Sequence, residues 1–493
     1  MNICSVFFAR KWPALQVESA VGEIGRLRFI CQQGESVFAA IEKCLDNGLG
    51  ICFVVDDNRK LRGRIRLDEL RQALRDGRLL AEPSVGGLLE RTGEPSDELE
   101  AEKNDAVRPL VDRHGCLIGV AVDRSRCFVQ IARPDLTHAE FRLALDAFLS
   151  SWISSTGAYV RQFQDRFAGF IGRRRGVAVS NCTAALHLAL TALDIGPGDE
   201  VVLPDLTFAA TINAVLHCGA TPVIVDIDPV SWGLSCETVM PALTSRTKVI
   251  LPVHLYGRPV AMGPILELAK AHGLHVIEDC AEAIGARHAG RMAGSFGEVA
   301  CFSFFANKTI TTGEGGMCLT DSPELADRLA ELRDHGMAPD RRYWHERVGF
   351  NYRMTNPQAA IGVAQLERIA AIFERNRRLE MLYREHLSEL PSIAFPDSLP
   401  AGNEASTWLV SLLVPPIQRG QLIEAARRAD IELRPFFYPL SQMPPYRGYG
   451  RDCPTSRSLS LSGLSLPTSD AVDTIIVKKL KDAFWKVLGR HAA

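Results

Sequence analysis

Between residues 177 and 319 the chain alternates short apolar runs with helical segments, and this alternation restricts its fold more than any other feature. The runs that are typical of strands lie at residues 177–179, 200–204, 221–226, 248–253, 275–279, 299–305 and 317–319. Strands that alternate with helices form a mainly parallel sheet. Ligands of such sheets bind beyond the carboxyl ends of the strands. We therefore expect an α/β fold with a site at that edge.

A lysine stands beyond one of these strand ends. The apolar run 299–305 is followed by Lys308, by three threonines within residues 309–312, and by the glycine-rich segment 313–316. An amine that is held in a cleft and partly desolvated suits the formation of a Schiff base. The spacing leaves a second interpretation open, in which Lys308 is an ordinary solvated lysine beside a plain hairpin.

Two further strand ends at the same edge carry polar groups. The strand that ends before Ser180 is followed by a helix that starts at about Thr183, and the free amides at a helix start bind anions. Asp279 ends the apolar strand 275–278, where a buried acid needs a partner. Simpler interpretations exist for both: an ordinary Ser/Thr helix cap at the first, and at Asp279 the N-cap of a helix over residues 281–286.

Several segments together resemble the DegT/DnrJ/EryC1/StrS sugar aminotransferases, which are pyridoxal-phosphate (PLP) enzymes of the aspartate aminotransferase fold, fold type I. Residues 304–317, FFANKTITTGEGGM, are similar to the family's cofactor-lysine segment, above all to that of its perosamine synthase branch. The other matching segments are WISSTG (152–157), SNCTAALHLAL (180–190), EDCAEAIGA (278–286), GFNYRM (349–354) and RPFFYPL (434–440). The resemblance covers residues 131–490.

The resemblance assigns roles to residues of this sequence. Lys308 would bind PLP as a Schiff base, and Asp279 would pair with the pyridine nitrogen, so these two are the candidate catalytic residues. The remaining candidate contacts all face the cofactor in the family: Cys182, Thr183 and Ser303 at the phosphate, Phe208 on the ring, Glu282 near the phenolic oxygen, and Asn351 at the phosphate.

Asn351 also implies an assembly, because the family's asparagine reaches the phosphate from the neighbouring subunit. We therefore expect a homodimer with a shared active site. The sequence departs from the family pattern at two positions. Cys182 stands where relatives often have glycine, and a backbone amide there still serves. Ser441 stands where relatives often have histidine, which puts a substrate contact from this position in doubt.

The function implied by the resemblance is a PLP-dependent aminotransferase. It would move an amino group from L-glutamate to a nucleotide-linked keto sugar, GDP-4-keto-6-deoxymannose in the perosamine branch, for surface polysaccharide biosynthesis. Two alternatives stay open: a UDP-linked keto sugar or cyclitol ketone as the substrate, and a non-catalytic protein that keeps PLP for structure while sensing a nucleotide. A family branch that dehydrates sugars carries histidine in place of the lysine, so Lys308 argues against that chemistry.

An internal repeat precedes the catalytic region. Residues 54–63 recur as residues 110–119, and each copy has the pattern of strand, Asp-rich turn and strand. Helices at 36–47 and 68–76 flank the first copy, an order that resembles a pair of CBS domains, which often bind adenine nucleotides. Arg66, Glu69 and Val122 depart from the CBS ligand pattern, so a structural role is the alternative.

Four regions follow from these patterns. They are an unassigned segment (1–25), the CBS-like module (26–130), a large PLP-binding domain (131–374) and a small C-terminal α+β domain (375–493).

Composition narrows the functional class. The chain is 46% hydrophobic and 23% charged, as soluble globular proteins are, and its net charge of −2 argues against a nucleic-acid or membrane-surface partner. Its 13 cysteines form no CxxC pair and no cluster at zinc-ligand spacing, so we expect reduced thiols and no metal. No signal peptide or membrane span is expected, which predicts a cytoplasmic protein.

Overall fold

A computed structural model of the chain describes residues 16–19, 29–47, 49–76, 84–85, 87, 89, 107–111, 113–122 and 128–489. The described residues fall into two compact units. The N-terminal unit comprises the described residues within Met1–Val129, Asp135–Arg142 and Asp470–Lys479. The main unit comprises the described residues within Gln130–Pro134, Leu143–Ser469 and Leu480–Ala493. Residues 77–83, 90–106 and 123–127 of the expected CBS-like module lie outside the described residues.

The N-terminal unit contains two three-stranded sheets. Its elements are β1 (Gln16–Ser19), β2 (Ile30–Gln32), α2 (Val37–Asp46), β3 (Ile51–Val55), β4 (Leu61–Arg66), α3 (Leu67–Arg75), β5 (Val107–Val111) and β6 (Leu117–Val122). In one sheet β3 pairs in parallel with β2 and antiparallel with β4. In the other sheet β6 is antiparallel to both β1 and β5. The helices expected around the first repeat are confirmed as α2 and α3.

The two repeats contact each other through matching positions. The amide of Leu61 donates to the carbonyl of Gly115 at 3.0 Å, and the amide of Leu117 donates to the carbonyl of Arg59 at 2.9 Å. Leu61 corresponds to Leu117 in the repeat, and Arg59 corresponds to Gly115, so the two bonds are reciprocal about a local two-fold axis. Val55 of the first copy and Leu117 of the second also share one apolar cluster. The duplication thus folds as a pair, while its likeness to CBS domains stays a prediction.

The main unit is built on a seven-stranded sheet in the order β7-β15-β14-β11-β10-β8-β9. Its strands are β7 (Arg175–Val179), β8 (Glu200–Pro204), β9 (Thr221–Val225), β10 (Thr247–Ile250), β11 (His275–Asp279), β14 (Val299–Ser303) and β15 (Gly316–Thr320). All neighbours from β9 to β14 are parallel, and β15 is antiparallel to both β14 and β7. The mainly parallel sheet that the alternation predicts is confirmed.

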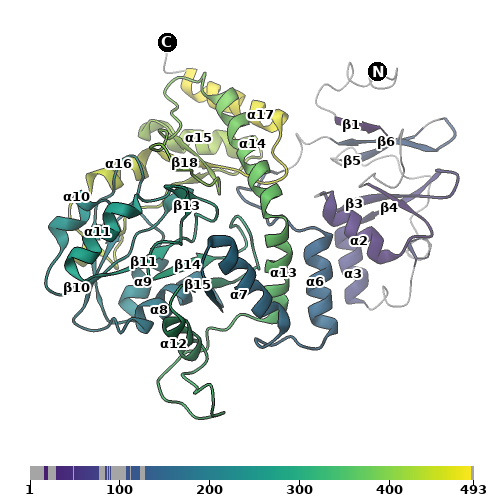
Figure 1. Ribbon diagram of the computed structural model, residues 1–493. Helices are drawn as coiled ribbons and strands as arrows, with labels where there is room; N and C mark the ends of the chain where they lie inside the picture. The colour runs from purple at the N-terminus through teal and green to yellow at the C-terminus, as the bar shows by residue number, and fades with distance from the viewer. Residues whose placement is uncertain are drawn as a thin grey trace. The chain divides into compact units, whose positions relative to one another are not determined.

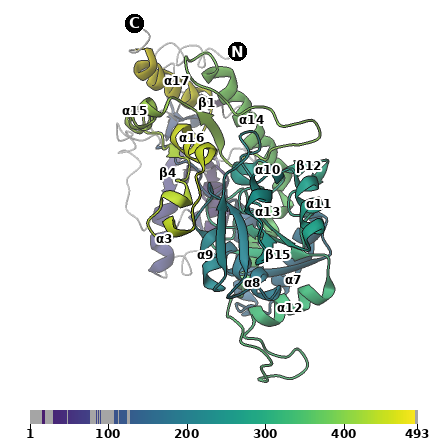
Figure 2. The same ribbon diagram turned by 90° about the vertical axis from the view of Figure 1, so that its left-hand side faces the viewer.

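Helices cover both faces of this sheet, as Figure 1 and the side view in Figure 2 show. Successive strand residues point to opposite faces: Val177, Cys301 and Cys318 pack in one cluster with α8, whereas Ala178, Phe302 and Met317 pack in another with α7 and α13. The helices in this part of the chain are α6 (His138–Leu149), α7 (Ala158–Ile171), α8 (Cys182–Ala192), α9 (Ala210–His217), α10 (Cys236–Val239), α11 (Met262–His272), α12 (Pro323–Arg333) and α13 (Asn356–Glu367).

The remaining elements follow α13 or lie in the connections. A small antiparallel sheet has the order β16-β18-β17. The later elements are α14 (Ile369–Leu387), β16 (Val410–Leu413), α15 (Pro416–Arg428), β17 (Arg434–Pro435), α16 (Pro454–Ser462), β18 (Gly463–Leu466) and α17 (Thr474–Leu488). A short hairpin pairs β12 (Arg287–His288) with β13 (Arg291–Met292). Among the described residues, no helix combines the length and the apolar character needed to cross a membrane.

The core beneath this sheet yields a stability prediction. Phe302 is fully buried and meets Phe167 edge to face, with ring centroids 5.0 Å apart. Phe302→Ala would leave a cavity, so we expect the free energy of unfolding to fall by about 3–5 kcal/mol. Urea denaturation measures it, with Phe148→Ala as the control because Phe148 is 65% exposed. Equal effects of the two substitutions would contradict the assigned core.

Candidate active site

A cavity of about 740 Å³ lies at the carboxyl ends of the parallel strands. The sequence predicted eight site residues, and every one except Asn351 lines this cavity. They come from the ends of β7, β8, β11 and β14 and from the loops that follow. The fold therefore brings together segments that are more than a hundred residues apart in the chain.

Lys308 lies in the connection between β14 and β15. Its backbone amide donates to the carbonyl of Phe305 at 2.9 Å, which closes the turn. Its side chain is only 12% exposed, and Nζ lies 3.3 Å from Oε1 of Glu282. Nζ also lies 3.8 Å from the ring centroid of Trp408. The amine is thus largely desolvated, and the interpretation of Lys308 as an ordinary solvated lysine is wrong.

Asp279 is the last residue of β11 and is 4% exposed. Its Oδ2 accepts a hydrogen bond from the hydroxyl of Thr211 at 2.9 Å, and its Oδ1 accepts one from the amide of Ala281 at 3.1 Å. Burial raises the pKa of Asp279 above its ordinary value, although these bonds and the charge of Lys308 oppose the rise. A cationic N–H in the cavity would favour the charged carboxylate. No helix follows Asp279, so its interpretation as an N-cap is wrong.

The start of α8 lines the part of the cavity where the sequence predicted an anion site. Asn181 caps the helix by accepting a hydrogen bond from the amide of Ala184 at 2.8 Å, so the alternative of an ordinary helix cap is met by asparagine and not by Ser or Thr. Cys182 and Thr183 occupy the first turn, where amides have no partner within the helix and the helix dipole favours an anion. Gly316 lies against this turn, and a Cβ there would stand 2.5 Å from the carbonyl carbon of Asn181. Only glycine lets β15 approach so closely.

Ser303 and Phe208 complete the expected cofactor contacts on this chain. Ser303 ends β14, is 6% exposed and faces the cavity beside the α8 turn. Phe208 follows β8 and is 60% exposed, with its ring centroid 5.6 Å from that of Phe437. A flat ring that is open on one side can stack on an aromatic ligand. The residues present therefore fit a phosphorylated aromatic cofactor.

Glu282 is held between Lys308 and the backbone of Tyr256. Its Oε2 accepts a hydrogen bond from the amide of Tyr256 at 3.0 Å. Tyr256 has a φ of 49°, which is uncommon for a residue with a side chain, and this conformation turns its amide toward the carboxylate. Burial raises the pKa of Glu282, whereas the charge of Lys308 opposes that rise.

Asn351 does not line the cavity of its own chain. It is exposed, and its backbone forms a bridge with Asp334. The next residue, Tyr352, lines the cavity and accepts a hydrogen bond from the amide of Ser180 at 2.7 Å. The role expected for Asn351 therefore remains a prediction.

Trp408, Thr211 and Tyr256 are among the cavity-wall residues to which sequence reasoning assigned no role in the site. Trp408 stands two residues before β16, which begins at Val410. No feature of the sequence around Trp408 indicates that its ring lies over Nζ of Lys308. Thr211 stands four residues after Thr207, and their hydroxyls are 3.1 Å apart. The four-residue interval in the sequence could have suggested two hydroxyls that hydrogen-bond to each other and to a buried group, here Asp279.

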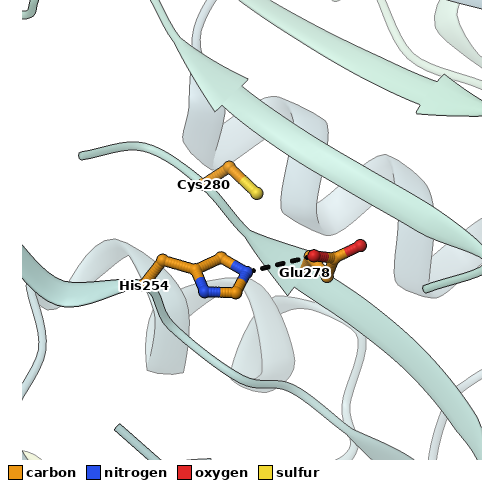
Figure 3. Close-up of side chains that lie close together, drawn as sticks. All are labelled: His254, Glu278 and Cys280. Atoms are coloured by element: carbon orange, nitrogen blue, oxygen red, sulfur yellow. Dashed lines mark hydrogen bonds and ion pairs between the residues drawn. The ribbon is translucent and has the colours of Figure 1, made fainter. Parts of the chain in front are cut away.

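Glu278 and Cys280, the residues on either side of Asp279 in the chain, form a buried cluster with His254 (Figure 3). Nε2 of His254 is 3.0 Å from Oε2 of Glu278, and both side chains are fully buried. Nδ1 of His254 accepts a hydrogen bond from the amide of Val260 at 3.0 Å, so Nε2 carries the proton and donates to Glu278. Both ring nitrogens of His254 are thus engaged in hydrogen bonds, and these bonds hold the end of β11 to the loop that carries His254.

Glu278 yields a prediction for pH dependence. Burial alone would raise the pKa of Glu278, but hydrogen bonds from His254 and from the amides of Gly294 and Gly297 outweigh burial and hold the pKa below its ordinary value. On acidification the unfolded chain therefore takes up this proton first. The stabilisation is complete above the ordinary glutamate pKa and is lost as the pH falls through the lower pKa of the folded protein.

We therefore expect Glu278→Gln to lower the free energy of unfolding at pH 7 by about 3 kcal/mol, because an amide cannot accept from all these donors. The loss should shrink as the pH falls below about 4. Chemical denaturation of the wild type and of Glu278→Gln, at pH 7 and again below about pH 4, measures this loss of unfolding free energy. Glu298→Gln serves as the exposed control. A loss that does not change with pH would show that Glu278 is uncharged in the folded protein.

A desolvated lysine, a buried aspartate and a helix start with free backbone amides line one cavity at the edge of a mainly parallel sheet, as in a PLP-dependent aminotransferase of fold type I. The chain belongs to the DegT/DnrJ/EryC1/StrS aminotransferase family, whose model matches residues 134–484. PLP is therefore its cofactor.

Three known proteins illustrate the similarity. GDP-perosamine synthase of Caulobacter vibrioides is 42% identical over 364 residues, which cover 73% of this chain and 98% of that protein. UDP-N-acetyl-3-dehydro-alpha-D-glucosamine 3-aminotransferase of Acidithiobacillus ferrooxidans is 46% identical over 243 residues, covering 49% and 65%. The PLP form of Spr1654 from Streptococcus pneumoniae superposes with a TM-score of 0.69 at 26% identity, covering 74% and 99%.

Proposed function

We propose that this aminotransferase moves the amino group of L-glutamate to a keto sugar carried on GDP, at carbon 4 of the sugar. The observation that carries the proposal is the cavity that joins Lys308, Asp279 and the start of α8. The choice of GDP is supported by the relative that is similar over nearly its whole length, a GDP-perosamine synthase. The substrate remains a proposal because fold and family do not define it.

The residues of the cavity divide the work of transamination. PLP, when bound, supplies an electron sink beside the reacting carbon. Lys308 Nζ first acts as a general base and removes the proton from the α carbon of the amino donor. It then acts as a general acid and delivers a proton to carbon C4′ of the cofactor. Asp279 would pair with the protonated ring nitrogen of the cofactor. The α8 amides and the Ser303 hydroxyl fix the phosphate, and Phe208 limits tilting of the ring.

The charge of the cavity wall bears on substrate binding. Among the described lining residues, only Lys308 and Arg434 carry a fixed positive charge, against the carboxyl groups of Asp279, Glu282 and Glu314. Nε of Arg434 lies 3.0 Å from Oε1 of Glu432, which orients the guanidinium. Glutamate and a nucleotide sugar are both anionic, so Arg434 is the group on this chain that would attract either of them.

A second copy of the chain belongs to the proposal. Asn351 is exposed beside Tyr352, which lines the cavity, yet Asn351 does not reach its own cavity. This placement agrees with an asparagine that serves the neighbouring subunit. The active enzyme would then be a homodimer in which each cavity receives Asn351 of the other chain.

The nucleotide carrier separates the proposal from its main alternative. A UDP-linked keto sugar is favoured by the relative that is 46% identical over a shorter span. We expect kcat/KM with GDP-4-keto-6-deoxymannose to exceed that with a UDP-linked keto sugar by on the order of 100-fold, because a base-specific site rejects a base that leaves polar groups unpaired. The reverse preference would establish the alternative. Failure to turn over glutamate with any keto sugar would favour a non-catalytic, sensing protein.

The role of Lys308 has its own test. We expect Lys308→Ala, reconstituted with PLP, to lack the visible absorbance band of the lysine-bound cofactor and to lose turnover by at least about a thousandfold. Lys270→Ala, on the exposed side of α11, is the control. Transamination by Lys308→Ala at the wild-type rate would show that another residue performs the proton transfer.

A further inference from the structure

Trp408 contacts both ends of Lys308. The face of its indole ring receives the amine, with Nζ 3.8 Å from the ring centroid. The edge of the same ring donates a hydrogen bond from Nε1 to the carbonyl of Asn307 at 2.6 Å, and Asn307 is the residue before Lys308. The indole thus binds the backbone carbonyl just before Lys308 and also contacts Nζ at the end of the lysine side chain.

The position of Trp408 is itself firmly determined. The residue is 5% exposed, and its carbonyl accepts a hydrogen bond from the hydroxyl of Thr468 at 2.8 Å. Its ring lies nearly parallel to that of Tyr256, at an interplanar angle of 13°. Tyr256 in turn holds Glu282, the other neighbour of Nζ. A cation at Nζ is therefore received by an aromatic face and a carboxylate that are linked through Tyr256.

Every turnover must pass through a state in which the amino donor has displaced Lys308 from the cofactor, and Nζ then needs partners within reach of its side chain, as Trp408 and Glu282 are. A buried ammonium without partners is costly, and an aromatic face lowers that cost. We propose that Trp408 is a positioning residue that, together with Glu282, receives Nζ of Lys308 after its release from the cofactor, holds the ammonium that forms when Nζ takes the proton of the α carbon, and keeps it beside the reacting carbon. The inference rests on the proposed role of Lys308 as the residue that binds the cofactor.

This role predicts an effect that general damage to the site would not produce. Removing the indole face destabilises only the free-lysine state, so the bond between Lys308 and the cofactor becomes relatively more favourable. We expect Trp408→Leu to bind PLP at least as tightly as the wild-type protein. Displacement by glutamate should be slower by on the order of tenfold, with little change in the glutamate concentration that gives half the maximal rate.

The experiment titrates the apo-protein with PLP and then follows the decay of the visible band after mixing with saturating glutamate. Trp408→Phe keeps an aromatic face without the Nε1 donor, so it should recover most of the rate. Trp232→Phe is the matched control, because Trp232 is 3% exposed and lies in the same aromatic cluster, where its ring faces Arg258. It should match the wild type in both measurements.

Each other outcome has a distinct meaning. A Trp408→Leu protein that decays at the wild-type rate, or that loses affinity for PLP in step with the rate, would overturn the inference. If Trp408→Leu does not fold, Trp408→Phe decides: a rate no higher than one-tenth of wild type would show that the aromatic face is not what matters. A wild-type protein without the visible band would refute the role of Lys308 itself and not that of Trp408.

Discussion

The structure depends most on the burial of polar groups at the carboxyl end of β11. Glu278 and Asp279 are adjacent, and both are buried in the main unit. Because side chains alternate across a strand, one carboxyl group faces the cavity and the other faces the opposite side. Glu278 is fully satisfied by His254 and by backbone amides, so it serves as a rigid support. Asp279 keeps bonding capacity toward the cavity, which is what a site for a cationic ring requires.

The same strand end orders the neighbouring loops. The amide of His254 donates to the carbonyl of Asp279, and the amide of Asp279 donates to the carbonyl of Pro252. The loop that leaves His254 carries Tyr256, whose amide holds Glu282. The backbone from His254 to Tyr256 therefore joins the buried hydrogen bonds of Glu278 to the one that holds Glu282 beside Lys308. Such networks fix a site at its geometry because each unpaired member would be costly.

The sequence predicted the parts of this arrangement that depend on local pattern. The alternation of runs indicated the parallel sheet, and Lys308 and Asp279 could be located because each follows an apolar strand. Contacts across the fold could not be found in this way. Trp408 is a hundred residues from Lys308 in the sequence. An aromatic residue near the start of an apolar run is typical of the hydrophobic core, so its sequence context did not indicate a place in the site. Ser441, where the sequence already put a substrate contact in doubt, donates from its amide and its hydroxyl to the two carboxylate oxygens of Asp205. Asn351 depends on a second chain.

The absorption spectrum of the purified protein, before and after addition of L-glutamate alone, tests the central claim most directly. The account predicts a visible band from cofactor bound to Lys308, and its loss as the amino group passes to the cofactor and Lys308 is released. A keto sugar should then restore the band. A protein that shows no band after addition of PLP, or a band that glutamate leaves unchanged, would contradict the assignment of this cavity as an aminotransferase site.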